Sequence, residues 1–295
     1  MVLFKDFILA SLIIIVLVSI YALSWSREKL CRVEIFGPPK LYAKPAVDEF
    51  HASHSSWVTQ FREHERKIFS QNGEDGVLLW IFSNIGTVNH PPRFVEFGVE
   101  NCIECNTRFL RQHLGWQGFM MDGSHENLSI NLHRELITTE NINSLLLKYQ
   151  TPAVIDLLSI DVDFEDYFIW KSILKAGRHR ARVVVIEHNY AIPPNENRVV
   201  NPFRDPRRWT GTEYYGAGIL AMAALGRLYD YTLVYAEENA VNLFFIETSI
   251  LKRVGVLHEV PSIEKLYVPT PMNGRRQLPE TDKTRLWIWN DTRWA

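Results

Sequence analysis

The middle of the chain alternates between short apolar runs and stretches in which apolar residues recur at helical spacing. Apolar runs that are nearly continuous are typical of strands buried on both faces of a sheet. The runs that predict strands are 94–97, 116–122, 137–142, 154–163, 183–189, 231–236 and 241–247. The periodic stretches that predict helices are 77–85, 104–114, 165–176 and 214–229. Strands that alternate with helices predict a mostly parallel, doubly wound α/β sheet.

The last two predicted strands are separated only by residues 237–240. A parallel pair would need a crossover of about a dozen residues or more, so these strands are expected to form an antiparallel hairpin. The predicted fold is therefore a Rossmann-like sheet of six or seven strands that ends in a C-terminal hairpin. A long segment rich in Pro, Asn and Arg, 190–213, precedes the last predicted helix. Loops of this length in a compact domain are usually lids or binding loops.

The N-terminal pattern differs from the rest of the chain. Residues 7–25 carry no charge, and their number is close to the ~20 apolar residues that span a bilayer as a helix, so 1–25 is predicted to be a transmembrane signal-anchor. A cleaved signal peptide is the alternative, although its apolar region is usually about 7–15 residues. Residues 26–67 contain prolines and a His/Ser stretch that predict a stem. The folded domain is expected at 68–250, and 251–295 is expected to be a tail that docks on it.

Composition and charge limit the function more than they identify it. The chain of 295 residues is 46% hydrophobic with a net charge of −2, which gives no basic field for nucleic acid. Two N-glycosylation sequons, at Asn127 and Asn290, would fit a single-pass glycoprotein of the endoplasmic reticulum or Golgi with a lumenal domain. The cysteines are Cys31, Cys102 and Cys105. The CxxC pair is expected to be local packing or a disulfide, with metal binding and redox chemistry as alternatives, and no second pair completes a zinc site.

Carboxylates and other polar groups follow the predicted strands. In a parallel sheet these carboxyl ends meet at one edge, where open α/β folds bind their ligands. The first strand leads into a turn with Gly98 set among acidic residues, and the second ends in Asp122, a candidate ligand for ribose hydroxyls or a solvated turn aspartate. The next two strands end in Asp161, Asp163, Glu187, His188 and Asn189. The polar segment 71–75 either overhangs this edge or caps the helix that follows it.

Several motifs occur together in one order along the chain. They are FSQNGEDG at 69–76, FVEFGVE at 94–100, CNTR at 105–108, GW at 115–116, MDG at 121–123, LSIDVD at 158–163, VIEHN at 185–189 and YGA at 215–217. As a set they resemble the FkbM-like methyltransferase family, in particular its branch with the SQNGED motif. Membrane-anchored relatives that resemble the Star protein of insects are similar too, and they imply trafficking or scaffolding.

The resemblance implies a class I methyltransferase fold, with S-adenosylmethionine as cofactor and O-methyl transfer as the reaction. A mostly parallel sheet that ends in a hairpin is also the organisation of S-adenosylmethionine-dependent methyltransferases. Carried over, the cofactor-binding residues would be Glu96, Gly98, Glu100, Asn101, Asp122 and Gly123. The branch commonly has a second glycine where this chain has residues 101–103. Cys102 therefore brings a side chain to a turn where the backbone should approach the ligand closely.

Methyl transfer requires mainly that the acceptor be oriented and lose its proton. The expected catalytic residues are Asp161, Asp163, Glu187 and His188, with Asp161 facing the methyl group and the acceptor. His188 or Asp161 is the expected general base. A carboxylate pair could instead hold a divalent cation that lowers the pKa of an acceptor hydroxyl. The remaining possibility is that Asp161 and Glu187 only cap strand ends.

Two other functions compete with a membrane-anchored methyltransferase. An apolar strand that ends in Asp161-Val-Asp163, on a chain with an anchor and a stem, resembles a metal-dependent Golgi glycosyltransferase. A non-catalytic interaction or trafficking domain is the other alternative, and Cys102 favours it. The expected methyl acceptor is a hydroxyl or carboxyl group of a small molecule, glycan or lipid, and the sequence does not identify it. Protein partners are compatible with each of these functions.

Overall fold

A computed structural model describes residues 56–203, 208–269 and 287–289. All of these residues belong to one compact unit, Ala52–Ala295. The predicted signal-anchor at 1–25, most of the predicted stem and the sequon at Asn290 lie outside the described residues. Among the described residues, no helix has both the length and the apolar character needed to cross a bilayer.

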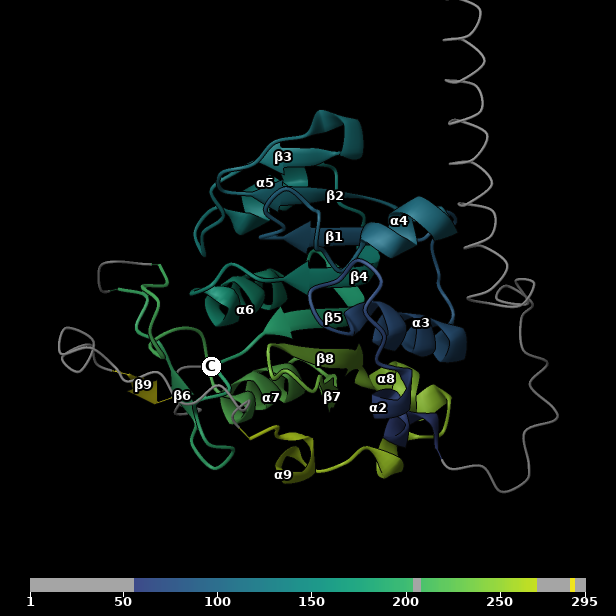
Figure 1. Ribbon diagram of the computed structural model, residues 1–295, viewed down its shortest axis with the longest axis vertical. Coiled ribbons are helices and arrows are strands. Elements are labelled where there is room, and N and C mark those ends of the chain that lie inside the picture. Colours follow the sequence, from purple (N-terminus) through teal and green to yellow (C-terminus); the bar gives the residue numbers. More distant parts are fainter. Residues whose placement is uncertain (1–55, 204–207, 270–286, 290–295) are drawn as a thin grey trace, which may run out of the picture. The chain divides into compact units, whose positions relative to one another are not determined.

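A seven-stranded sheet forms the centre of this unit (Figure 1). Its strands are β1 (Arg93–Phe97), β2 (Gln117–Asp122), β3 (Leu132–Arg134), β4 (Val154–Ile160), β5 (Arg180–Glu187), β7 (Tyr231–Ala236) and β8 (Asn242–Glu247). The order across the sheet is β3-β2-β1-β4-β5-β8-β7. Neighbours among β1 to β5 are parallel, and β8 is antiparallel to both β5 and β7. The predicted mostly parallel, Rossmann-like sheet is confirmed, and its last two strands form a hairpin.

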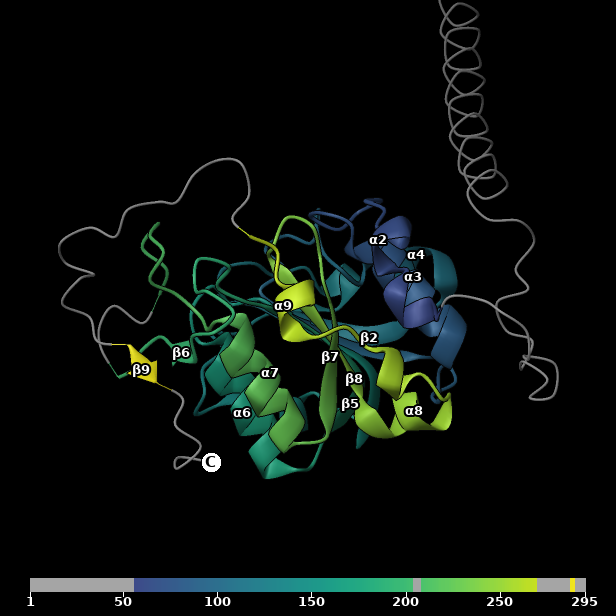
Figure 2. The same ribbon diagram turned by 90° about the horizontal axis from the view of Figure 1, so that it is seen from below.

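Helices cover both faces of the sheet (Figure 2). One face packs against α5 (Ile142–Lys148), α6 (Asp166–Ala176), α7 (Ile219–Leu228) and α9 (Ile263–Leu266). The other face packs against α2 (Phe61–His64), α3 (Glu74–Ile85), α4 (Arg108–Leu114) and α8 (Thr248–Arg253). The described residues also form three short 3-10 helices: η1 (Trp57–Thr59), η2 (Leu128–Ile130) and η3 (Leu257–Glu259). The strands β4 and β5 are apolar on both sides because both of their faces are covered in this way.

The segment before α3 is part of the packed unit. Val58 and Phe61 are each only 1% exposed and lie in the same apolar cluster as α3 and α8. The indole Nε1 of Trp80 donates a hydrogen bond to the carbonyl of Trp57 at 3.0 Å. The packed unit therefore includes residues that the sequence pattern assigned to the stem.

Two predicted elements between β1 and β4 differ from the observed ones. The strand expected at 137–142 is wrong: β3 is Leu132–Arg134, and the later residues turn into α5. This turn forms because the Thr138 N–H donates to Oδ1 of Asn141, which is local side-chain bonding that competes with a strand. The helix expected from residue 104 begins at Arg108, because the preceding N–H groups of Asn106 and Thr107 donate to Glu96 instead.

The long segment 190–213 contains a short strand of its own. Its strand β6 (Arg198–Val199) pairs antiparallel with β9 (Ile288–Trp289), which belongs to the predicted tail. The ring of Trp287 lies 4.6 Å from that of Tyr214, between ring centroids. This part of the tail therefore contacts the loop that precedes α7, which begins at Ile219 rather than at the expected residue 214.

Candidate functional site

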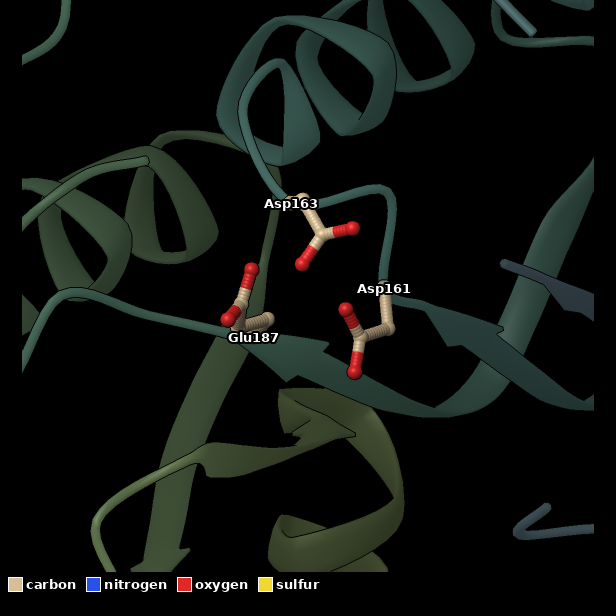
Figure 3. A group of neighbouring side chains, drawn as sticks. All are labelled: Asp161, Asp163 and Glu187. Atoms are coloured by element: carbon tan, nitrogen blue, oxygen red, sulfur yellow. The ribbon is translucent and has the colours of Figure 1, made fainter. Parts of the chain in front are cut away.

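Three carboxylates converge where β4 and β5 end (Figure 3). Asp161 directly follows β4, Asp163 lies in the loop to α6, and Glu187 is the last residue of β5. Each offers a carboxylate oxygen, and these oxygens all lie within 4.8 Å of one another. We call these residues the acidic trio. The register explains their proximity: Ile160 is paired with Ile186, so the next residue of each strand stands at the same level and on the same face.

The acidic trio holds its protons more tightly than ordinary carboxylates. Burial raises the pKa of Asp161 well above its usual value, and the nearby charges of Asp166 and Asp163 raise it further. Burial likewise raises the pKa of Glu187, followed by repulsion from Asp161 and Asp166. A carboxylate whose pKa is moved toward neutrality is suited to accept a proton near physiological pH. Asp161 and Glu187 are partly buried, whereas Asp163 is exposed.

The turn after β1 packs against the loop that follows β4 and carries Asp161 and Asp163. Gly98 has φ +70°, and a Cβ built at this position would stand 1.4 Å from the carbonyl oxygen of Asp161. The Asp161 N–H donates to the carbonyl of Phe97 at 3.3 Å. Only glycine allows the two backbones to approach so closely in this conformation. The glycine predicted to contact a cofactor therefore positions Asp161.

Glu96 supports the turn from inside the protein. It is 3% exposed, and its carboxylate accepts hydrogen bonds from the N–H groups of Asn106 and Thr107 at 2.7 and 3.0 Å and from the Thr107 hydroxyl. Burial raises the pKa of Glu96, and these hydrogen bonds oppose the shift. Its side chain therefore orders the segment before α4, which makes Glu96 a positioning residue of this edge.

Asp122, at the end of β2, accepts hydrogen bonds from two loops at the same edge of the sheet. Its Oδ2 accepts from the Glu100 N–H at 2.8 Å, and its Oδ1 accepts from the N–H groups of Ser124 and His125 at 2.8 and 2.9 Å. Burial raises its pKa, but these hydrogen bonds and the His125 side chain outweigh burial, so the pKa is lowered overall. Asp122 is therefore an ionised carboxylate that already orders two loops.

The remaining residues of the predicted cofactor site are on the surface. Glu100, Asn101 and Gly123 are exposed. The charges of Glu100 and Asp122 are close enough to raise the pKa of Asp163, after burial as the larger cause. The acidic residues that follow β1 and β2 and the acidic trio thus lie along one edge of the sheet. This edge carries an excess of negative charge.

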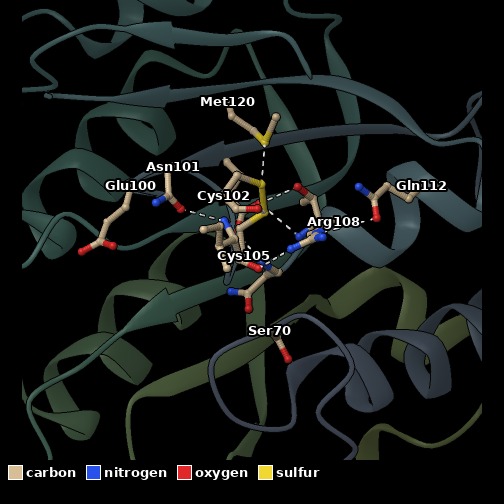
Figure 4. Close-up of a disulfide and its surroundings, with 12 residues drawn as sticks. Ser70, Glu100, Asn101, Cys102, Cys105, Arg108, Gln112 and Met120 are labelled. Atoms are coloured by element: carbon tan, nitrogen blue, oxygen red, sulfur yellow. Dashed lines mark hydrogen bonds between the residues drawn. A yellow bond between two sulfur atoms is a disulfide. The ribbon is translucent and has the colours of Figure 1, made fainter. Parts of the chain in front are cut away.

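A disulfide joins Cys102 to Cys105 within the turn (Figure 4). Both residues are buried, and Sγ of Cys102 lies 3.4 Å from Sδ of Met120 on β2. Cys102 has φ +57°, a conformation that non-glycine residues rarely adopt. The disulfide is one of the two expected outcomes for the CxxC pair. Its side chains point into the apolar cluster beside α3 and β2 rather than toward the acidic trio.

His188 does not belong to the acidic trio. It is 1% exposed, its Nδ1 lies 3.0 Å from the carbonyl of Val241, and its Nε2 is buried without a partner among the described residues. Burial lowers its pKa to about 4, so it is neutral at physiological pH. His188 points away from the acidic trio because consecutive side chains of an extended chain point to opposite faces, and it directly follows Glu187. Asn189 is also buried, and its side-chain amide binds the carbonyls of Glu213 and Tyr215.

Two residues near the acidic trio were not predicted from sequence. Asp166 begins α6, is 0% exposed, and raises the pKa of both Asp161 and Glu187. Tyr215 lies before α7, and burial followed by the charge of Glu187 raises the pKa of its phenol. The only sequence signal for Tyr215 was its place in the YGA motif.

The polar segment before α3 is bound mainly to itself. Oδ2 of Asp75 accepts from the N–H groups of Ile68, Phe69 and Ser70, at 2.7–2.8 Å. Glu74 is buried and accepts from Asn72 and from the side chain of Asn242 on β8. These bonds order the segment itself, and the N-cap residue of α3, Gly73, provides no side-chain cap, so they do not bear out the capping interpretation.

Comparison with protein-family models and with curated proteins finds no match to this chain.

Proposed function

We propose that this protein is an S-adenosylmethionine-dependent methyltransferase that acts on an oxygen atom of its acceptor. The observation that carries the proposal is the combination of a mostly parallel sheet, a terminal hairpin and an acidic carboxyl edge. That combination is the organisation expected from the family resemblance. Ligands of open α/β sheets bind beyond the carboxyl ends of the strands, which is where these acidic residues lie.

The chemistry of the edge fits a cationic cofactor. S-adenosylmethionine carries positive charge on its sulfonium and its amino group, and the edge presents Glu100, Asp163 and the rest of the acidic trio. Glu96 and Asp122 would act by ordering the loops, because their oxygens already accept hydrogen bonds from them. Direct contact with the cofactor would then fall to the exposed Glu100, Asn101 and Gly123.

The acidic trio supplies the chain's own chemistry. When bound, S-adenosylmethionine supplies a methyl group whose bond to sulfur breaks as its bond to the acceptor oxygen forms, which leaves S-adenosylhomocysteine. Glu187 or Asp161 accepts the proton that the acceptor hydroxyl loses. Burial raises the pKa of both carboxyl groups, which makes each a stronger base than an ordinary carboxylate once it is ionised. His188 has no part in this step, since its ring is directed elsewhere.

A metal-dependent transferase that uses a nucleotide sugar is the second candidate. It is favoured by one observation, the proximity of Asp161 and Asp163 to a third carboxylate. Such an enzyme would bind the sugar's phosphates through a divalent ion, and it would require that ion for any binding of the nucleotide. A UDP-sugar titration with and without Mn²⁺ therefore separates the two candidates.

Titration of the full-length chain with S-adenosylmethionine and S-adenosylhomocysteine, in EDTA, tests the proposal. We expect saturable binding by calorimetry and a thermal shift with both ligands, since ligands that bind only the folded state stabilise it. Glu100→Gln should weaken the binding at least tenfold. Glu104→Gln is the matched control, because Glu104 is also exposed in the same turn and pairs with Lys67 instead.

A folded chain that binds neither ligand would refute the methyltransferase proposal. Equal affinity in wild type and Glu100→Gln would leave the fold interpretation intact and would reject the assigned cofactor edge.

A further inference from the structure

The acidic trio concentrates negative charge that nothing in the described residues offsets. The three carboxylates come from two neighbouring strand ends and the loop to α6, and they point toward one another (Figure 3). The ion pairs found among the described residues involve other carboxylates, such as Asp156 with Arg182 and Glu247 with Arg180. Carboxylates this close repel each other unless protons or a cation neutralise them.

A fourth carboxyl group, that of Asp166, lies close enough to the acidic trio for its charge to raise the pKa of Asp161 and Glu187. Its Oδ1 accepts a hydrogen bond from the Val162 N–H at 2.7 Å, so the group faces the segment between Asp161 and Asp163. Asp166 is 0% exposed, and its Oδ2 is buried with no hydrogen-bond partner among the described residues. A buried, unpartnered carboxylate oxygen is costly. One oxygen of Glu187, Oε2, is also buried with no hydrogen-bond partner in the described part of the chain.

We propose that the acidic trio binds one divalent cation of the Mg²⁺ or Mn²⁺ type, with Asp166 as a nearby supporting carboxylate. Hard divalent cations prefer oxygen ligands, and Mg²⁺ is usually bound by a few carboxylates together with water and substrate oxygens. The absence of any histidine or cysteine from this group of described residues disfavours zinc. The exposed position of Asp163 leaves the other side of the ion open to a ligand.

The metal site itself is independent of the proposed function. Only the role given to the ion in methyl transfer rests on that function. A cation at this position would bind a hydroxyl or carboxylate oxygen of the methyl acceptor. With the ion bound, Asp161 and Glu187 would act as its ligands and no longer as the base. The ion would lower the pKa of a bound hydroxyl, and the proton of that hydroxyl would pass to water. The acceptor class is then one that can chelate a metal through oxygen.

Electron paramagnetic resonance of Mn²⁺ titrated into the purified full-length chain, without S-adenosylmethionine, tests the site. We expect one bound Mn²⁺ per chain, displaced by excess Mg²⁺. The double variant Asp161→Asn/Glu187→Gln should weaken the binding at least a hundredfold, and Asp163→Asn at least tenfold. Asp163 is exposed, so its variant keeps the test decisive if the double variant fails to fold. Glu63→Gln, an exposed carboxylate on α2, is the control and should bind Mn²⁺ as the wild type does.

Absence of bound Mn²⁺, or equal binding by the folded trio variants and the wild type, would overturn the proposal. The outcome is independent of the proposed function, because S-adenosylmethionine binding is measured separately in EDTA. If the chain binds Mn²⁺ but does not bind S-adenosylmethionine, the metal site stands and the methyltransferase proposal is rejected. If the chain binds S-adenosylmethionine but does not bind Mn²⁺, the methyltransferase proposal stands and the metal site is rejected.

Discussion

Single residues at the carboxyl edge act mostly on the backbone. Glu96 and Asp122 accept hydrogen bonds from loop N–H groups, and Gly98 lets the β1 turn rest against the carbonyl of Asp161. These residues carry the acidic and glycine positions of the sequence motifs. Their geometry indicates that these motif residues hold the carboxyl edge in place. Fewer residues can therefore contact a ligand than the family resemblance implies.

Replacement of Gly98 by alanine should destabilise the fold strongly. A Cβ would meet the Asp161 carbonyl oxygen at 1.4 Å, and φ is +70° as well. We expect a loss of about 3 kcal/mol or more in the free energy of unfolding, from overpacking and backbone strain together. Gly115→Ala is the control, because Gly115 also has φ +70° but has no atom within 4 Å of a built Cβ. It should lose only about 1–2 kcal/mol. Equal losses in urea denaturation would contradict the close approach of the two backbones.

Among the elements, the β7–β8 hairpin contains a buried acid at its turn. Glu237 is 0% exposed, and its carboxylate accepts hydrogen bonds from the N–H groups of Asn239, Val241 and Asn242. Burial outweighs these bonds and raises the pKa of Glu237 to about 7. The turn is thus held by a group that binds its proton more tightly in the folded state than in the unfolded state.

The stability of the hairpin should therefore depend on pH. Between pH 4.5 and about 7 the folded state binds the extra proton, so the contribution of Glu237 is complete below that range and is lost as the pH rises through it. Urea denaturation across this range should show a shallower fall for Glu237→Gln than for the wild type. The exposed neighbour Glu238 provides a control, since Glu238→Gln should keep the wild-type profile. Parallel profiles for the wild type and Glu237→Gln would rule out this role.

At the scale of the whole molecule, the packed unit starts earlier than the motifs do. Val58 and Phe61 belong to the apolar cluster beneath α3, although they precede the first motif. A chain that begins at Ala52 should fold with nearly all of the stability of this unit. A chain that begins at residue 68 should lose at least about 3 kcal/mol, because burial of a large apolar side chain contributes about 1.5–3 kcal/mol. Equal denaturation midpoints for the two truncated chains would show that the early segment contributes nothing.

The sequence by itself determined the elements whose signals are local. Apolar runs identified every strand of the main sheet except β3, and the short link at 237–240 required the hairpin. The acidic trio was also foreseeable in part, because residues that follow neighbouring parallel strands must meet at one edge. The N-terminal anchor stays a prediction from the sequence.

Only the tertiary structure decided which side chains face that edge and which are already occupied. Glu187, the last residue of β5, belongs to the acidic trio, whereas the next residue, His188, is buried and within hydrogen-bond distance of the Val241 carbonyl. Tyr215 joined the site through packing between segments distant in sequence, which no local pattern records. Asp166 is close to the acidic trio in sequence, but only the structure shows that its side chain turns back to the Val162 N–H. In the folded chain, Glu96 and Asp122 accept hydrogen bonds from loop N–H groups. Hydrophobic periodicity identifies a buried strand, but the contacts at its end depend on the chain's long-range arrangement.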